Sequence, residues 1–185
     1  MTVREGTGDH SVPSREAALL SHYERHAHHY RSPLDRLSVI EVMRALGVSG
    51  MSILDVGCGD GRLVDQLPPD WVVDGIDYSP TRIRLARERR RYRRLVCGSV
   101  YDLADHFPDR YDVAVAVELL EHTERPADVI DQIRRVAASL LATVPIDMPY
   151  RAHLQVYPSA GAAAEALGAH RFRRFGRHVA LAWSW

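Results

Sequence analysis

The sequence has 185 residues, and its 24 Lys and Arg balance its 24 Asp and Glu, so no overall charge draws the chain to nucleic acid or to a membrane. This length suits one domain whose core needs no disulfide or metal to hold it together. No apolar run is long enough to span a bilayer, and residues 1–10 lack the apolar centre of a signal peptide. We therefore predict a cytoplasmic protein in which Cys58 and Cys97 remain free thiols.

The first part of the chain predicts a leader followed by helices. Residues 1–14 are polar and contain glycine and proline, so we expect a flexible leader ahead of a single domain over residues 15–185. The apolar spacing from Leu34 to Leu46 predicts a helix that packs on a sheet and ends at Gly47.

Residues 51–78 are the most informative stretch of the chain. The apolar run Ile53–Val56 and the glycine-rich residues 57–61 precede an amphipathic segment, which predicts a buried strand, a tight turn and the start of a helix. A second apolar run, Trp71–Ile76, stops at Asp77, which lies 20 residues after Gly57. In a βαβ unit such an acid lies at the tip of the second strand and accepts hydrogen bonds from ribose hydroxyls. The stretch therefore predicts a nucleoside site.

The spacing of the glycines argues against a dinucleotide. The dinucleotide fingerprint is G-x-G-x-x-G, whereas this turn reads G-x-G-x-G and has Arg62 where the last glycine is needed. Asp55 and Asp60 also place two carboxylates beside the turn. These would repel a pyrophosphate but suit a ligand that carries an ammonium and a sulfonium.

The remaining segments alternate between expected helices and strands. A helix begins at Ser79-Pro80 and carries an arginine run, which we interpret as a solvated face, with RNA or an acidic partner as the alternative. Another helix is expected over Ser159–Leu167. Further strands are expected at Leu95 onwards, Asp112–Val117, Leu140–Val144, His170–Phe175 and Val179–Trp185.

The motif E-L-L-E-H follows the fourth expected strand. If it forms a helical turn, Glu118, Glu121 and His122 point the same way. Two carboxylates and an imidazole supply part of the octahedral or tetrahedral ligand set of a metal ion such as Mg²⁺ or Zn²⁺. His153, after the fifth strand, is a fourth candidate ligand. The alternative is a site without metal, in which a glutamate supports the fold or the substrate and a histidine acts as a base.

Together these motifs resemble a known family. Residues 53–61, I-L-D-V-G-C-G-D-G, are similar to the first motif of the class I S-adenosylmethionine-dependent methyltransferases. The segment from Glu118 to Val136 resembles the corresponding motif of the ubiquinone-biosynthesis O-methyltransferases. The turn at residues 118–122 and His153 are also similar to the magnesium ligands of Hen1-type RNA methyltransferases.

The resemblance implies a fold and a set of site residues. The fold is a Rossmann-like, doubly wound α/β domain whose seven-stranded, mostly parallel sheet has the order 3-2-1-4-5-7-6, with S-adenosyl-L-methionine across the strand ends. Asp77 would hold the ribose, Ser99 and Val100 would flank adenine, and His122 or His153 would serve as the base. Ser99 departs from the acid that is common at its position. The other expected cofactor contacts are Asp55, Gly57, Gly59, Gly61, Tyr78, Glu118 and Leu119, and Tyr23 and Tyr30 are candidates for closing the site.

The expected function is methylation, most simply O-methylation of a small molecule. Few residues separate the fifth and sixth strands, so the acceptor is either small and partly exposed or presented by a partner. A Hen1-like, metal-dependent RNA 3′-end 2′-O-methyltransferase is one alternative, which the neutral net charge disfavours. A non-catalytic S-adenosylmethionine-binding subunit is another. The sequence leaves the oligomeric state open.

Overall fold

The computed structural model describes residues 15, 19 and 38–185 of the chain. The helices from residue 38 onward, with η for a 3-10 helix, are α2 (Val39–Ala45), η2 (Arg62–Gln66), α3 (Pro80–Glu88), η3 (Val100–Asp102), α4 (Leu103–His106), η4 (Leu120–His122), α5 (Pro126–Val136) and α6 (Ala160–Leu167). The strands are β1 (Ser52–Val56), β2 (Val72–Asp77), β3 (Arg94–Cys97), β4 (Tyr111–Val117), β5 (Ala137–Pro145), β6 (Arg171–Phe175) and β7 (His178–Ser184).

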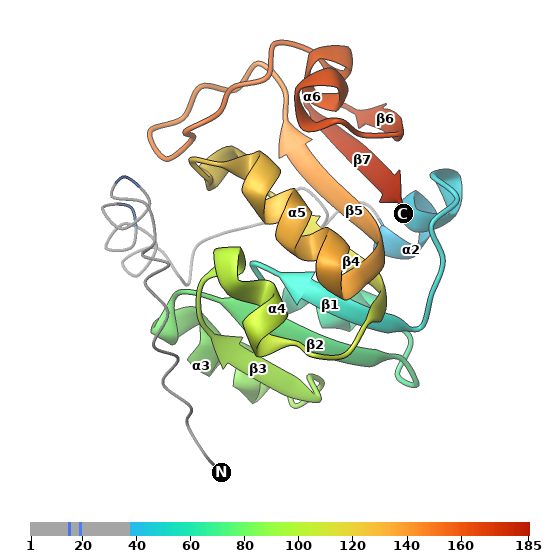
Figure 1. The fold of residues 1–185 in the computed structure, drawn as a ribbon, viewed down its shortest axis with the longest axis vertical. Coiled ribbons are helices and arrows are strands. Elements are labelled where there is room, and N and C mark those ends of the chain that lie inside the picture. Colours follow the sequence, from blue (N-terminus) through green and yellow to red (C-terminus); the bar gives the residue numbers. More distant parts are fainter. Residues whose placement is uncertain (1–14, 16–18, 20–37) are drawn as a thin grey trace.

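The seven strands form one sheet in the order β3-β2-β1-β4-β5-β7-β6, which confirms the predicted topology (Figure 1). Strands β1 to β5 are parallel to their neighbours, while β7 runs antiparallel to both β5 and β6. Because parallel strands end at the same edge of a sheet, residues that follow β1, β2, β3, β4 and β5 gather along one edge. That edge carries every site residue predicted after a strand.

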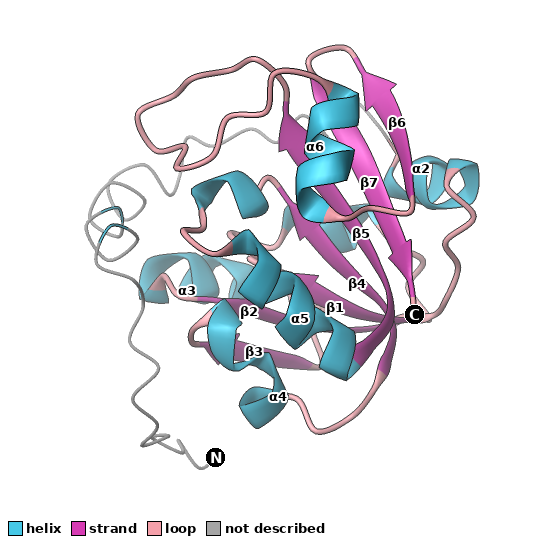
Figure 2. Ribbon diagram, turned by 45° about the horizontal axis from the view of Figure 1, so that its top comes forward, coloured by secondary structure: helices cyan, strands magenta, loops and turns pink. Residues whose placement is uncertain are grey.

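Alternate strand residues face two separate apolar layers, as the period of a strand requires. On one side Leu54, Ala114 and Leu140 pack with η3, α4, α5 and α6, which lie in front of the sheet in Figure 2. On the other side Ile53 and Val113 pack with α2 and η2. Helices on both faces explain why the central strands are mostly apolar.

Two segments differ from the sequence-based expectation or lie outside the description. The helix expected after the glycine turn is only the five-residue 3-10 helix η2. Most of the expected leader and the tyrosines Tyr23 and Tyr30 lie outside the described residues, as does the start of the helix expected from Leu34. The helix itself, α2, begins at Val39 rather than at Leu34, because Ser38 caps it by accepting a hydrogen bond from the backbone N–H of Glu41.

Two further expectations are met within the described residues. Both cysteines are free thiols, with Cys58 buried and Cys97 exposed. Each helix of this part of the chain is too short or too polar to cross a bilayer.

Candidate functional site

The glycine turn and Asp77 face each other across the adjoining ends of β1 and β2. The backbone N–H of Gly59 donates to one Asp77 carboxylate oxygen at 2.9 Å, and the N–H of Ser79 donates to the other at 2.9 Å. Gly57, Gly59 and Gly61 all have positive φ, between 55° and 81°, a region that glycine occupies without strain. Each carboxylate oxygen accepts more than one hydrogen bond, so Asp77 retains acceptor capacity toward a ligand.

Asp55 lies behind this turn and is bonded to a tyrosine that the sequence pattern did not indicate. The Tyr92 hydroxyl donates to Asp55 at 2.5 Å, and the Asp55 side chain is almost fully buried. Burial raises the pKa of Asp55 to about 7, against the opposing effect of the Tyr92 hydrogen bond. Tyr92 also fills the space beside Gly61 and Gly75, where a Cβ atom would lie 2.9 Å from its ring.

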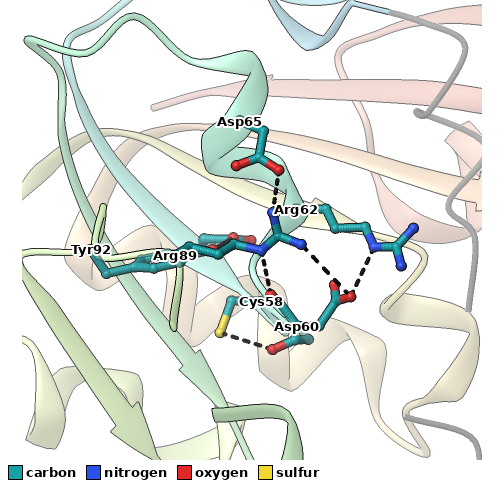
Figure 3. Close-up of polar contacts among 8 residues, drawn as sticks. Cys58, Asp60, Arg62, Asp65, Arg89 and Tyr92 are labelled. Atoms are coloured by element: carbon teal, nitrogen blue, oxygen red, sulfur yellow. Dashed lines mark hydrogen bonds and ion pairs between the residues drawn. The ribbon is translucent and has the colours of Figure 1, made fainter. Parts of the chain in front are cut away.

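Asp60 is paired with arginines and does not present an unbalanced charge to a ligand. Its carboxylate lies 2.8 Å from Nε of Arg62 and 4.0 Å from Nη2 of Arg89 (Figure 3). Arg89 also donates to the backbone carbonyl of Asp60 at 2.7 Å and forms an ion pair with Asp65. These contacts hold the glycine turn from the side of α3, and the role expected of Asp60 toward a cationic ligand stays a prediction.

The other expected cofactor residues lie along the same edge of the sheet. Leu119 covers Gly57 so closely that a Cβ atom there would lie 2.9 Å from its Cδ1. Ser99 caps η3, because its hydroxyl accepts a hydrogen bond from the N–H of Tyr101 at 3.1 Å. Tyr78 and Val100 are half-buried. Their roles toward a cofactor stay predictions.

Glu118 departs from the expected helical turn. Its φ is +51°, which is strained for a residue with a Cβ atom, and η4 begins only at Leu120. The hydroxyl of Thr143 donates to one oxygen of Glu118 at 3.0 Å, and Nε2 of His178 lies 3.5 Å from the other. Burial raises the pKa of Glu118 to about 7. Glu118 is thus oriented toward β5 and β7.

The other three predicted metal ligands come together. Ligand atoms of Glu121, His122 and His153 all lie within 4.8 Å of one another, and Glu118 is not part of this group. Glu121 is fully buried, and neither of its carboxylate oxygens has a hydrogen-bond partner among the described residues. Burial, followed by the charge of Glu118, raises the pKa of Glu121 well above its usual range.

Both histidines of this group have a defined tautomer. Nδ1 of His122 lies 2.8 Å from the carbonyl of Ala152, and Nδ1 of His153 lies 2.8 Å from the carbonyl of Met148. A carbonyl only accepts, so each Nδ1 carries the proton and each neutral ring presents Nε2 as its basic nitrogen. A backbone carbonyl on the second nitrogen is the usual support of a metal-binding histidine, and it suits a general base equally well.

Most of the arginine run after Ser79 is exposed, as expected, but some of its guanidinium groups bind polar groups of the chain. Besides Arg89, Arg91 donates to the carbonyls of Pro68 and Pro69, and Arg93 forms two hydrogen bonds with the buried Asp74 at 3.0 and 2.6 Å. These side chains hold the loops around β2. Arg84 and Arg87 are exposed.

The sequence pattern did not indicate four polar residues that lie at the candidate site. They are Tyr92, Thr143, Tyr157 and His178. Thr143 and His178 lie within strands whose pattern reads as apolar, so only the observed register of β5 and β7 brings them to Glu118.

Comparison with known proteins connects this site to one family. Residues 54–139 match the model of a methyltransferase domain. The ubiquinone biosynthesis O-methyltransferase of Pseudomonas paraeruginosa is 31% identical over 153 residues, which is 75% of this chain and 64% of that protein. The chain spans 44% to 64% of the length of the curated relatives it matches.

Solved structures share the fold at lower identity. Magnesium protoporphyrin IX methyltransferase from Synechocystis, with S-adenosylhomocysteine bound, has a TM-score of 0.65 and 14% identity over 91% of this chain and 98% of that one. The methyltransferase domain of a bacterial Hen1 has a TM-score of 0.60 and 19% identity over 82% of this chain and 98% of that one. At these identities the likeness establishes the fold alone.

Proposed function

Since the chain belongs to the class I S-adenosylmethionine-dependent methyltransferases, we propose that it transfers the methyl group of S-adenosylmethionine to a hydroxyl of a small molecule in the cytoplasm. The observation that carries this proposal is the opposition of the Gly59 N–H and the Asp77 carboxylate, 2.9 Å apart at the ends of β1 and β2. The glycine turn leaves its backbone open to a ligand, and the adjacent Asp77 carboxylate can accept hydrogen bonds from ribose hydroxyls.

The cofactor supplies an already activated methyl group on its sulfonium, so the protein mainly orients the reactants. Gly57, Gly59 and Gly61 let the backbone approach the methionine part, while Asp77 accepts from the ribose hydroxyls. Ser99 and Val100 flank the adenine. Leu119, which packs on Gly57, lies between the cofactor residues and the cluster at Glu121.

A hydroxyl acceptor must lose its proton as its oxygen takes the methyl group. Nε2 of His122 or of His153 accepts this proton, because Nδ1 of each ring donates to a backbone carbonyl. The products are a methyl ether and S-adenosylhomocysteine, with the proton on the imidazole. Tyr150, which is about half exposed and packs against His153, and the half-exposed Val156 on the same loop give a small aromatic or apolar acceptor an accessible surface.

A divalent metal at Glu121, His122 and His153 is a second form of this chemistry. The residues fit one, because the buried Glu121 carboxylate, which has no hydrogen-bond partner among the described residues, lies close to two imidazoles of defined tautomer, with Nε2 of His122 at 3.7 Å. One oxygen and two nitrogens suit Zn²⁺ better than Mg²⁺, which prefers oxygen ligands. A bound metal would lower the pKa of an acceptor hydroxyl.

The same cluster supports a Hen1-like activity on RNA ends as the second candidate function. It predicts transfer of a methyl group to the 2′-hydroxyl of a short RNA that ends in a free ribose, and loss of that transfer with chelator. Equal activity on a 3′-terminal 2′-deoxynucleotide would exclude it. A chain that binds S-adenosylhomocysteine but transfers methyl to neither RNA nor any small hydroxyl compound would instead support a non-catalytic subunit.

The proposal is tested by calorimetric titration of the chain with S-adenosylhomocysteine, followed by methyl transfer from radiolabelled S-adenosylmethionine to a panel of small phenols and catechols. We expect saturable binding and label in an organic-soluble product. Absence of binding at millimolar ligand would refute it. Repeating the transfer with chelator, and with Zn²⁺ or Mg²⁺ added back, separates the metal-assisted form from the histidine base.

A further inference from the structure

Arg82 is a partly buried arginine of α3 to which the proposed methyl transfer assigns no role. Its backbone is fixed in the first turn of the helix, because the N–H of Arg82 donates to the capping hydroxyl of Ser79 at 3.1 Å. The N–H of Ser79 in turn donates to Asp77 at 2.9 Å. Arg82 therefore belongs to a segment that is held directly to the proposed ribose acceptor.

The guanidinium of Arg82 lies against the middle glycine of the turn. A Cβ atom added to Gly59 would lie 3.2 Å from Nη1 of Arg82, and apart from its chain neighbours it would meet no other atom of the described residues within 4 Å. At Gly57 and Gly61, by contrast, such an atom would lie only 2.9 Å from the side chains of Leu119 and Tyr92. The space over Gly59 is therefore bounded by the end of one flexible side chain, which leaves room for a ligand.

The carboxylates beside the turn already have partners of their own. Asp60 pairs with two other arginines, and Asp55 accepts a hydrogen bond from Tyr92. A further cation at the turn is thus not needed to balance these two acids. In S-adenosylmethionine the ammonium and the sulfonium are cationic and the adenosine is neutral, so the methionine carboxylate is the one anionic group that such a cation could bind. A guanidinium matches a carboxylate well, because two parallel N–H···O bonds can form.

We propose that Arg82 is a further cofactor-binding residue, whose guanidinium binds the carboxylate of the methionine part of S-adenosylmethionine. Two charged side chains then hold the cofactor at Gly59, since Asp77 accepts from the ribose hydroxyls and Arg82 donates to the carboxylate. This inference rests on the proposed function, because it requires the same cofactor.

The test uses two ligands that differ in one group. They are S-adenosylhomocysteine and its decarboxylated analogue, which keeps the nucleoside, the sulfur and the amino group. In calorimetric titration the unmodified chain should bind the analogue about 10- to 100-fold more weakly, the range expected for loss of a hydrogen-bonded charge pair. Arg82→Met should weaken S-adenosylhomocysteine by a similar factor and leave the affinity for the analogue unchanged. The matched control is Arg84→Met, since Arg84 is an exposed arginine of the same helix, and it should bind both ligands as the unmodified chain does.

The unmodified chain alone can overturn the inference, by binding the two ligands equally. Equal loss of affinity for both ligands in Arg82→Met would also overturn it, because Arg82 would then act on the nucleoside or on the fold. Circular dichroism checks that each variant is folded, and Arg82→Gln takes the place of Arg82→Met if that variant is not. Binding of neither ligand to the unmodified chain would refute the proposed function itself and the inference with it, whereas binding without discrimination refutes the inference alone.

Discussion

Replacing Asp77 by asparagine separates its proposed role toward ribose from its role in the fold. In the structure its two oxygens accept from the N–H groups of Gly59 and Ser79, and in the proposed complex they also accept from two ribose hydroxyls. Asparagine retains one acceptor oxygen and replaces the other with a donor. A hydrogen bond to a charged group contributes about 1.5–3 kcal/mol. We expect Asp77→Asn to lose about 2–3 kcal/mol of binding to S-adenosylhomocysteine, or roughly 30- to 150-fold in Kd.

Asp74→Asn is the matched control on the same strand. Asp74 is also buried and lies nearer the start of β2, where it accepts from Arg93 and from Tyr111. Both variants lose a buried carboxylate that serves several donors, so both should lower the free energy of unfolding by a similar amount, about 1–3 kcal/mol.

The affinity is measured calorimetrically at a temperature where circular dichroism shows each variant to be folded. Only Asp77→Asn should weaken the binding of S-adenosylhomocysteine. Equal loss of affinity in the two variants would assign Asp77 to the fold alone, and unchanged affinity in both would remove it from the cofactor site.

Three further comparisons test the glycine turn and its surroundings. Burial raises the pKa of Asp55 from 3.8 to about 7, so the folded state binds the proton more tightly than the unfolded chain, and stability falls as the pH rises from about 4 to about 7. Asp55→Asn should abolish that decline, and urea unfolding at pH 8 should show it to be more stable than the unmodified chain by roughly 2–4 kcal/mol. A parallel decline with pH in the variant and the unmodified chain would show that Asp55 is not the cause. Arg89→Ala should cost about 1–3 kcal/mol and weaken S-adenosylhomocysteine binding, while Arg91→Ala, which loses only bonds to the carbonyls of Pro68 and Pro69, should leave the affinity unchanged. Gly57→Ala and Gly168→Ala each strain a positive φ by about 1–2 kcal/mol, but only Gly57→Ala crowds Leu119 and should reduce cofactor binding in the same titration.

The fold was predictable because its signals are local. Apolar runs, the glycines at 57–61 and the acid at 77 each determine a strand, a turn or a strand end within a few residues. The family pattern then supplies the strand order, which the structure reproduces. The shortened η2 escaped prediction because Leu63, Val64 and Leu67 have the same spacing in a longer helix.

The acceptor side of the site was predictable only in part. The motif at 118–122 indicated Glu121 and His122, which the structure brings together with His153, but the direction of Glu118 depends on its positive φ, which no side-chain pattern indicates. This turn directs Glu118 toward Thr143 and His178 and leaves Glu121 with His122 and His153. The partners of Glu118 come from strands 25 and 60 residues further along the chain, so sequence spacing alone cannot pair them.

Under the proposed function, this difference between the two sides predicts where substrate choice is determined. The proposed cofactor side consists of backbone groups and one carboxylate at the ends of β1 and β2, and the side chains that hold its turn, such as Arg89, come from residues 60–92. The acceptor side consists of side chains on η4 and on the loop between β5 and α6, and that loop is joined to η4 through the carbonyl of Glu121. Changes in residues 147–157 can therefore alter the accepted hydroxyl compound without disturbing the cofactor contacts. The half-exposed Tyr150 and Val156 are the positions where such changes should shift the KM for the acceptor while the affinity for S-adenosylhomocysteine stays constant.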